Sequence, residues 1–334
     1  MKKTYYLFNP GRLSRKDNTL KFVPVDADDK EGTPRYLPVE GVDDLYCFGS
    51  LDTNSSVMNF LGKHKISIHY FDYYEHYTGS FYPKEYLLAG KLRVAQALAY
   101  QNPTSRLLIA RRFITGAAAN MQKNLAYYQR RNKDLQTVID EITQWACKIT
   151  EANDIESLMG VEGNIRQTYY KAFDTIINDF EMGGRTRRPP ENEVNALISF
   201  GNMLCYTACL DQIYHTQLDP TISFLHEPGY RRFSLALDLA EVFKPVLVDR
   251  LIFRLFNKHQ IKDDDFDWKV KGIVLKPKGK KTFVKAWEER LGETIKHRTL
   301  GRKVSYKHLI RIECYKLTKH LLDIETYQPF KIWW

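Results

Sequence analysis

The sequence predicts an α+β protein, with a small N-terminal β-sandwich-like domain at residues 1–83 and a larger all-α domain at residues 91–334, joined by a linker at residues 84–90. Two observations lead to this prediction. Residues 1–83 contain short runs of aromatic and β-branched residues between turn clusters, which is the pattern of strands. After Pro83 the apolar residues recur with helical spacing nearly to the end of the chain.

The N-terminal strands are expected to be short and about ten residues apart, a spacing typical of a small sandwich. The expected strands are KTYYLF, LKFVPV, RYLPV, LYCF, ISIHYF and SFYP, separated by turns such as NPGR and DADDKEGTP. A short helix is expected at Ser55–Lys63, because its first two residues are serines. The aromatic residues near the end of this domain either pack within the sheet or stack on bases, and sheet packing is the commoner role. They are Tyr70, Phe71, Tyr73, Tyr74 and Tyr77.

The C-terminal domain is expected to be a series of helices, with Pro103 and Asp154 among the boundary signals. The expected helices are 84–101, 104–132, 134–152, 154–181, 191–217, 233–257, 284–295 and 304–323. Between them, the Gly- and Pro-rich segment 183–193 reads as a loop, and residues 258–283 read as a polar connector. Pro245 lacks an N–H group, so it should kink or restart the helix that contains it.

The formal net charge of +10 is unevenly distributed. Residues 103–133 carry seven Lys/Arg and no acid, and residues 269–320 carry sixteen Lys/Arg against four Glu. Cations at this density favour a polyanion, because binding to nucleic acid releases counterions from the phosphate backbone. An anionic membrane is less favoured, since the basic stretches are interleaved with core residues. A merely solvated basic surface is the remaining alternative.

Simple features narrow the class of protein. No apolar run reaches the roughly 18 residues of a membrane span. The N-terminus lacks the apolar stretch of a secretion signal, so we expect a cytoplasmic protein with no membrane partner. The five cysteines form no CxxC pair and are expected to be reduced thiols of the core. The motifs GxxxxGKS/T, GxSxG and HExxH are absent, which leaves nucleotide hydrolysis, serine-esterase and zinc-protease chemistry unsupported.

Carboxylates interrupt an otherwise apolar helix in the segment Leu225–Pro245. Asp238 and Glu241 are three residues apart and therefore share one face of that helix. They form either a solvated helix face or, together with His226 upstream, a mixed nitrogen and oxygen ligand set. Such a set suits Mg²⁺ or Mn²⁺, and the imidazole favours Mn²⁺.

A further carboxylate, Glu162, lies at the edge of a buried helix face. Arg166 follows four residues later, so an ordinary helix ion pair, worth about 0.3–0.5 kcal/mol, is one explanation for it. Gly163 comes directly after Glu162 and costs the helix about 1 kcal/mol relative to Ala. A glycine beside an acid indicates that another group approaches closely there.

These segments resemble a known family. VEGNIRQTYYKAF, RRPPENEVNALISFGNMLCY and LHEPGYRRFSLALDLAEVFKPVLVDRLIF resemble, in order, the three signature blocks of the CRISPR-associated integrase, the first-numbered Cas family and nuclease of the spacer-acquisition complex. ISIHYFDYYEHYTGSFYP looks like the end of that family's N-terminal β domain. Lys244 departs from the family, where many members have Arg, and Ala240 stands where a larger apolar residue is common. Phe233 after a doubled Arg is similar to the type I-B branch.

The resemblance implies a metal-dependent DNA endonuclease and integrase with a catalytic helical domain. Glu162, His226 and Glu241 match the family's metal ligands, and Asp238 matches a neighbouring, secondary acid. In that family the 3′-hydroxyl of a DNA fragment attacks a phosphodiester of the CRISPR repeat and inserts a new spacer; water in its place gives hydrolysis. On this hypothesis Mg²⁺ or Mn²⁺ neutralises the buried acids. His226 is then a ligand, a proton carrier or both.

The resemblance also implies partners. The DNA is double-stranded, branched or single-stranded, and Arg231, Arg232, Arg187 and Arg188 are candidates for contacts to its backbone. Loose surface arginines are the alternative for each. The family works as a homodimer joined through its β domains, together with a small ferredoxin-like CRISPR adaptation protein, and some subtypes add a nuclease that trims DNA ends.

Two rival functions stay open at this point. One is a catalytically silent nucleic-acid-binding protein, which would have the same charge pattern without the metal. The other is a metal-dependent phosphohydrolase for small molecules, which the dense cationic charge of residues 269–320 disfavours because a small substrate needs only a few cations.

Overall fold

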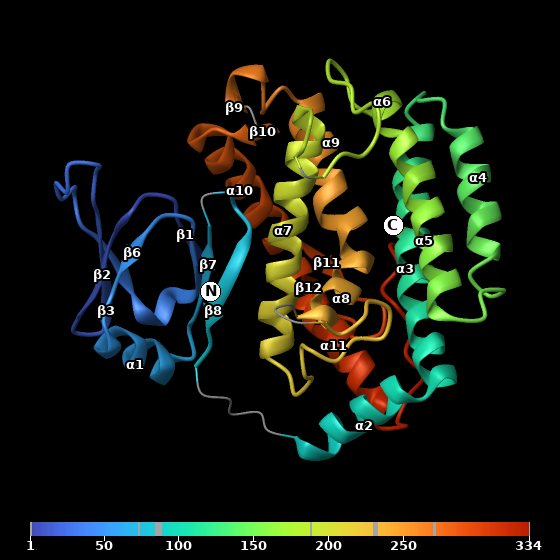
Figure 1. Cartoon of the computed structure of the whole chain (residues 1–334), viewed down its shortest axis with the longest axis horizontal. Helices are drawn as coiled ribbons and strands as arrows, with labels where there is room; N and C mark the ends of the chain where they lie inside the picture. Colours follow the sequence, from blue (N-terminus) through green and yellow to red (C-terminus); the bar gives the residue numbers. More distant parts are fainter. Residues whose placement is uncertain are drawn as a thin grey trace. The chain divides into compact units, whose positions relative to one another are not determined.

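A computed structural model describes residues 2–72, 74–83, 89–187, 189–229, 233–269 and 272–333 of the chain. The chain divides into two units, Met1–Leu88 and Ala89–Trp334. The division falls within residues 84–90, the segment that the sequence assigns to a linker. A strand-rich N-terminal unit is followed by a mainly helical unit, as the sequence predicts (Figure 1).

In its described residues the N-terminal unit contains two four-stranded sheets and one α-helix. Its elements are β1 (Lys3–Leu7), β2 (Gly11–Lys16), β3 (Thr19–Pro24), β4 (Arg35–Pro38), β5 (Val42–Cys47), β6 (Leu51–Asp52), α1 (Ser55–His64), β7 (Ser67–Phe71) and β8 (Tyr77–Phe81). One sheet has the order β1-β5-β7-β8 and the other β4-β3-β2-β6. Helix α1 begins one residue after Asn54, whose side chain accepts a hydrogen bond from Val57 N–H.

The two sheets and α1 share one hydrophobic core, which includes Leu13, Leu45 and Phe60. Strand β2 was not among the expected strands, because GRLSRK carries few apolar residues. Its alternate residues are nevertheless buried against β3, where Leu13 pairs with Phe22. Phe71 is buried and stacks on Phe48 with ring centroids 4.5 Å apart, so this aromatic residue packs within the unit.

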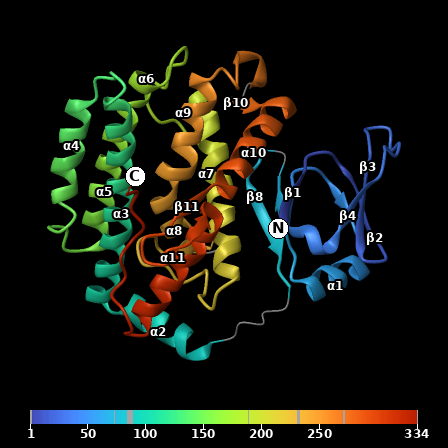
Figure 2. The same ribbon diagram turned by 180° about the vertical axis from the view of Figure 1, so that it is seen from behind.

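The helical unit consists mainly of helices that pack against one another. Its helices are α2 (Gly90–Gln101), α3 (Pro103–Gln129), α4 (Gln136–Cys147), α5 (Ile155–Lys171), α6 (Phe173–Ile176), α7 (Glu193–Tyr214), α8 (Ser234–Lys244), α9 (Arg250–Asn257), α10 (Pro277–Gly292) and α11 (Tyr306–Leu321). Helices α3, α4 and α5 pack together in both views (Figures 1 and 2), and α8 packs between α3 and α7. Asn102 and Asn192 cap α3 and α7 through their side chains.

The helix expected at 233–257 is interrupted at its proline. Residues Pro245–Asp249 form a π-helical turn between α8 and α9. Proline cannot donate the hydrogen bond that a regular α-helix requires at this position, so the sequence correctly indicated a break here. The turn displaces the register of the residues after it, beginning with Arg250.

The sequence suggested an all-α domain here, but the helical unit also contains β-strands. Two short antiparallel hairpins occur in it, β9 (Phe266–Lys269) with β10 (Gly272–Leu275) and β11 (Thr294–Lys296) with β12 (Lys303–Ser305). The expected connector 258–283 therefore contains a hairpin and the start of α10. Phe266 and Leu275 are buried, and these apolar positions are too few to show a strand pattern in the sequence.

The C-terminal segment after α11 lies along α3. Asn120 of α3 receives a hydrogen bond from Ile332 N–H at 2.8 Å, and its amide donates to the carbonyls of Val242 and Phe330 at 2.9 and 3.2 Å. Tyr327 is buried and donates to Glu313 of α11 at 2.6 Å. The segment is thus tied both to α3 and to the backbone of α8. None of the described helices is long and apolar enough to cross a membrane.

Candidate metal centre

Helix α5 carries Glu162 near its middle. Asp154 starts the helix by accepting a hydrogen bond from Ser157 N–H at 2.7 Å, and the Ser157 hydroxyl faces Asp154 N–H in return. The Glu162 side chain is 18% exposed, which places it at the edge of the buried face as expected. A Cβ atom added at Gly163 would meet no atom within 4 Å, so the helix surface beside Glu162 is open.

Arg166 joins two carboxylates from different helices. Its Nε atom lies 3.2 Å from Glu162 Oε1 on the same helix, and its Nη2 atom forms an ion pair with Glu241 of α8. The Arg166 side chain is buried. The Glu162–Arg166 helix pair that the sequence suggested is therefore present, but it is one half of a bridge between α5 and α8.

Glu241 is buried in the middle of this bridge. Besides Arg166, it binds Lys244 one turn along α8. Burial alone would raise the pKa of Glu241, but the charges of Arg166, Lys244 and His226 outweigh it and lower the pKa to about 2. Glu241 is consequently a carboxylate at neutral pH. Because Asp238 and Glu241 are both buried, the alternative of a solvated helix face does not hold.

Asp238 holds His226 in the loop before α8. One Asp238 oxygen accepts hydrogen bonds from the backbone N–H groups of Phe224 and Leu225 at 2.7 and 3.0 Å. The other accepts from His226 N–H at 2.9 Å and lies 2.8 Å from His226 Nδ1. A carboxylate can only accept here, so Nδ1 carries the proton and Nε2 is the free nitrogen of a neutral His226.

This arrangement bears on the secondary metal ligation expected of Asp238. Both of its oxygens are already engaged by donors of the 224–226 loop, which favours a positioning role. Burial disfavours the charged form of His226, but the hydrogen bond and charge of Asp238, together with Glu241, outweigh it and raise its pKa. The acid that fixes the histidine also makes it more basic.

The three expected ligands, Glu162, His226 and Glu241, lie in one region, but their donor atoms are not close enough to share one metal ion as they stand. Glu162 and Glu241 share Arg166, and the charge of Glu241 acts on His226. The donor atoms of the three do not all lie within 4.8 Å of one another. Instead, Arg166 pairs with both carboxylates and Lys244 pairs with Glu241.

The residues nevertheless fit a divalent cation by their chemistry. Two carboxylates and one imidazole nitrogen are donors that Mg²⁺ and Mn²⁺ accept. Glu241 stays ionised although it is buried, and this state requires a cation beside it. A divalent ion bound by these residues would meet that requirement in place of Arg166 and Lys244.

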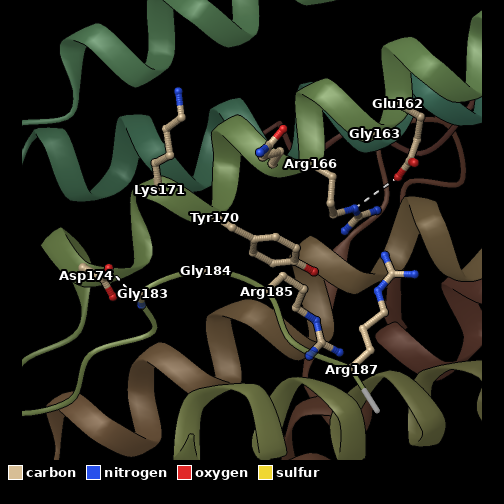
Figure 3. Close-up of a pocket in the computed structure, with 11 residues that line it drawn as sticks. Glu162, Gly163, Arg166, Tyr170, Lys171, Asp174, Gly183, Gly184, Arg185 and Arg187 are labelled. Atoms are coloured by element: carbon tan, nitrogen blue, oxygen red, sulfur yellow. Dashed lines mark hydrogen bonds and ion pairs between the residues drawn. The ribbon is translucent and has the colours of Figure 1, made fainter. Parts of the chain in front are cut away.

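A pocket of about 600 Å³ opens beside Glu162. Its wall includes Gly163, Arg166 and Tyr170 from α5, and Arg185 and Arg187 from the loop before α7 (Figure 3). Figure 3 shows Arg187 extending from that loop toward Arg166 and Glu162. Three guanidinium groups therefore line the same cavity as Glu162.

The loop that carries Arg185 and Arg187 is held by side chains at both ends. Asp174 of α6 accepts hydrogen bonds from the N–H groups of Met182 and Gly183 at 2.5 and 3.2 Å. Asn195 of α7 accepts from Arg185 Nη1 at 2.9 Å and donates to the Gly184 carbonyl at the same distance. Gly183 and Gly184 have positive φ angles of 58° and 131°, which explains the two consecutive glycines.

The four arginines expected to contact DNA have different outcomes. Arg187 is exposed and lines the pocket beside Glu162. Arg188, Arg231 and Arg232 lie outside the described residues. Sequence reasoning missed Arg185, which is half-buried, and gave Arg166 no role beyond a helix pair. The signal for Arg166 was a cation among the apolar positions of α5.

Asp249 is a further buried acid close to this centre. It is buried and lies at the end of the π-helical turn. Burial raises its pKa to about 7, against the opposing charges of Arg166 and Lys244. Asp249 therefore changes charge near neutral pH, unlike Glu241.

Comparison with known proteins identifies similar chains along the whole length. The family model described as CRISPR associated protein Cas1 matches residues 5–289. A CRISPR-associated endonuclease Cas1 from Fusobacterium nucleatum subsp. nucleatum is 47% identical over 100% of this chain and 98% of its own. A CRISPR-associated endonuclease Cas1 from Thermodesulfovibrio yellowstonii is 45% identical, with 100% of both chains covered.

Solved structures show the same architecture. A Cas1 protein from Thermotoga maritima has a TM-score of 0.85 at 40% identity, covering 98% of this chain and 100% of its own. A casposase bound to integration product has a TM-score of 0.86 at 20% identity, covering 98% of this chain and 93% of its own. The latter likeness concerns the fold.

Proposed function

The chain belongs to the Cas1 family of CRISPR-associated proteins, and on that premise we propose that it is a metal-dependent DNA endonuclease and integrase. It inserts new spacer DNA into a CRISPR array through attack of a DNA 3′-hydroxyl on a phosphodiester of the repeat. The observation that carries the proposal is the meeting of Glu162 and Glu241 at Arg166, with His226 fixed nearby by Asp238. Relatives named endonuclease, similar over their full length, support the same reaction class.

We propose that Glu162, Glu241 and the Nε2 atom of His226 hold the divalent cation, either Mg²⁺ or Mn²⁺. When bound, the ion supplies Lewis-acid polarisation of the scissile phosphate. Glu241 contributes a carboxylate that is already ionised, because its pKa is about 2. Asp238 contributes orientation, since its hydrogen bond to Nδ1 turns the other imidazole nitrogen outward.

Arg166 and Lys244 have a second role in this proposal. Without the ion they neutralise Glu241 and keep the centre from holding an unpaired buried charge. With an ion bound to the carboxylates, Arg166 and Lys244 would be available to pair with phosphate oxygens of the substrate. They would then place positive charge beside the reacting phosphodiester, where negative charge develops.

The DNA path proposed here begins at the pocket beside Glu162. Arg185 and Arg187 face this pocket, and a strand that passes through it reaches the carboxylate. Arg188, Arg231 and Arg232 remain proposed backbone contacts on the strength of the sequence alone. Contacts of this type bind phosphates without reading sequence.

We further propose that the protein acts with partners. The solved structures similar in fold include a Cas6-RT-Cas1–Cas2 complex and a casposase bound to integration product. By analogy, we propose double-stranded, branched and single-stranded DNA as substrates and the small ferredoxin-like Cas2 as a protein partner, with an end-trimming nuclease in some systems. We propose a homodimer joined through the β-strand unit in the cytoplasm. Sedimentation of a single species at the 39.2 kDa chain mass at micromolar concentration would contradict the dimer.

The decisive experiment is strand transfer of a labelled duplex into a repeat-bearing plasmid in Mn²⁺, with the Cas2 partner added. Glu162→Gln should abolish transfer while leaving DNA binding intact. Glu156→Gln is the matched control, since Glu156 is an exposed acid in the first turn of the same helix. If wild type neither cuts nor joins branched DNA, the alternative of a catalytically silent DNA-binding protein holds instead.

A further inference from the structure

A second pocket, of about 460 Å³, lies where the end of α3 meets α9 and the end of α10. It shares no lining residue with the pocket beside Glu162. Its cationic side chains are Arg131, Arg250, Arg254, Lys258 and Arg290. Glu293 is the only acid among its lining residues in the part of the chain that the structure describes.

The cations of this second pocket are only partly neutralised. Arg254 and Arg290 share Glu293, through a contact of 3.9 Å and a closer one respectively. Among the described residues, Arg131, Arg250 and Lys258 form no ion pair with a carboxylate. The pocket therefore retains a surplus of positive charge in a concave site, where an anion is attracted more strongly than on a flat surface.

Two of the unpaired arginines are arranged around one tyrosine. The guanidinium carbon of Arg131 lies 3.9 Å from the ring centroid of Tyr127, and that of Arg250 lies 5.2 Å from it. Burial lowers the pKa of Arg250, and the charge of Arg290 lowers it further. A bound anion would offset both effects. Stacked guanidinium and phenol planes also offer a flat surface to a nucleobase.

The backbone links this pocket to the candidate metal centre. Asp249 and Arg250 are consecutive residues at the end of the π-helical turn. The environment of Asp249 includes Arg166 and Tyr169, whereas Arg250 lines the second pocket. An anion bound by Arg250 would thus contact the residue next to Asp249, which lies beside the candidate metal centre.

We propose that the second pocket binds a phosphodiester of a DNA strand outside the reaction centre, with Arg131, Arg250 and Lys258 as its ligands. The assignment of the anion to DNA rests on the proposed function. Guanidinium groups match phosphate oxygens with paired N–H donors, and an aromatic ring beside them suits a nucleotide better than an acidic peptide. The contact fixes the path of the strand at a second point.

The test uses the full chain and a fluorescein-labelled branched duplex, with binding followed by anisotropy in EDTA between 50 and 200 mM salt. Arg131→Gln combined with Lys258→Gln should make the slope of log K against log salt shallower by about 1 to 2. Both residues are exposed, so the fold should survive. The control combines Arg130→Gln with Lys123→Gln, which removes the same charge from exposed positions outside the pocket. Equal losses in both pairs would overturn the proposal.

A neutral backbone linkage identifies the contact directly. One methylphosphonate is moved along the strand, a linkage at a time. At one or two linkages it should weaken binding of the wild type at least threefold and have no further effect on the Arg131 and Lys258 double variant. Equal effects in both proteins at every linkage would refute a phosphate contact here. Competition by poly-glutamate that equally depends on these residues would assign the pocket to an acidic protein.

The two proposals fail separately in this design. Binding is measured without a divalent ion, so it does not depend on catalysis at Glu162. Failure of strand transfer in the wild type with a normal linkage effect would reject the proposed reaction and retain the pocket. Normal transfer with no linkage effect would do the reverse.

Discussion

Glu241 and Arg166 form an ion pair in which both side chains are less than one-tenth exposed, although they are 75 residues apart in the sequence. Each is costly to bury without the other. The pair therefore ties α5 to α8 and, at the same time, occupies a carboxylate that we assign to the metal.

Replacement of Arg166 separates these two effects. Arg166→Gln should destabilise the metal-free protein by about 3–5 kcal/mol, because Glu241 is left as a buried charge with Lys244 as its main cation. Mn²⁺ should restore more stability to this variant than it adds to the wild type, since the ion no longer competes with a guanidinium. Thermal unfolding in EDTA and in Mn²⁺ measures both. An equal gain from Mn²⁺ in the two proteins would show that Arg166 does not compete with the ion.

Asp238→Asn tests the orientation of His226. The amide retains the shape but removes the charged acceptor, so we expect Mn²⁺ affinity to fall about 10- to 100-fold. Calorimetric titration measures this fall. A fall as large as that caused by His226→Ala would instead place Asp238 among the direct ligands.

The pH dependence of metal binding follows from His226. A protonated imidazole cannot bind a metal, and the pKa of His226 is raised above its ordinary value of 6.5. Mn²⁺ affinity should consequently decrease as the pH is lowered, and the decrease should begin above pH 6.5. Titrations between pH 6 and 8.5 give the profile. His226→Ala should bind more weakly and lose this dependence; retention of the profile would exclude His226 as its source.

Asp249 should make the metal-free protein less stable as the pH rises, whereas an ordinary salt-bridged acid makes a protein more stable as the pH rises. Its pKa is about 7 in the folded chain, against an ordinary 3.8. Between these values the folded chain retains a proton that the unfolded chain has lost. The free energy of unfolding therefore decreases as pH rises through this window, by up to about 1.4 kcal/mol per pH unit.

Asp249→Asn should remove this contribution. Urea unfolding in EDTA at pH 5 and pH 8 should show a smaller decrease in stability for the variant than for the wild type. Glu156→Gln, at an exposed position, is the control for a change of one charge. Identical pH dependence in wild type and Asp249→Asn would mean that Asp249 is ionised throughout.

The sequence was sufficient for the order of units and for most helices, because helical spacing is regular over long segments and Asp154 supplies a recognisable start. It did not reveal β2 or the hairpin at residues 266–275. In β2 the burial comes from the partner strand, and in the hairpin the apolar residues are too few to form a pattern.

The candidate ligands Glu162, His226 and Glu241 were found through the family resemblance. The contacts that the surrounding residues make with them could not be predicted from the sequence. Arg166 bridges two helices, and a bridge of this kind cannot be read from spacing along either helix alone. The engagement of Asp238 with three successive backbone N–H groups depends on the path of the 224–226 loop. Such contacts are tertiary, so local sequence patterns do not encode them.

The C-terminal segment after α11 also matters for the choice of where to truncate the protein. Asn120 clamps Ile332 with one end of its amide and the carbonyl of Val242, the neighbour of Glu241, with the other. Shortening the protein by its final dozen residues would deprive that amide of a partner and loosen the helix beside the acid.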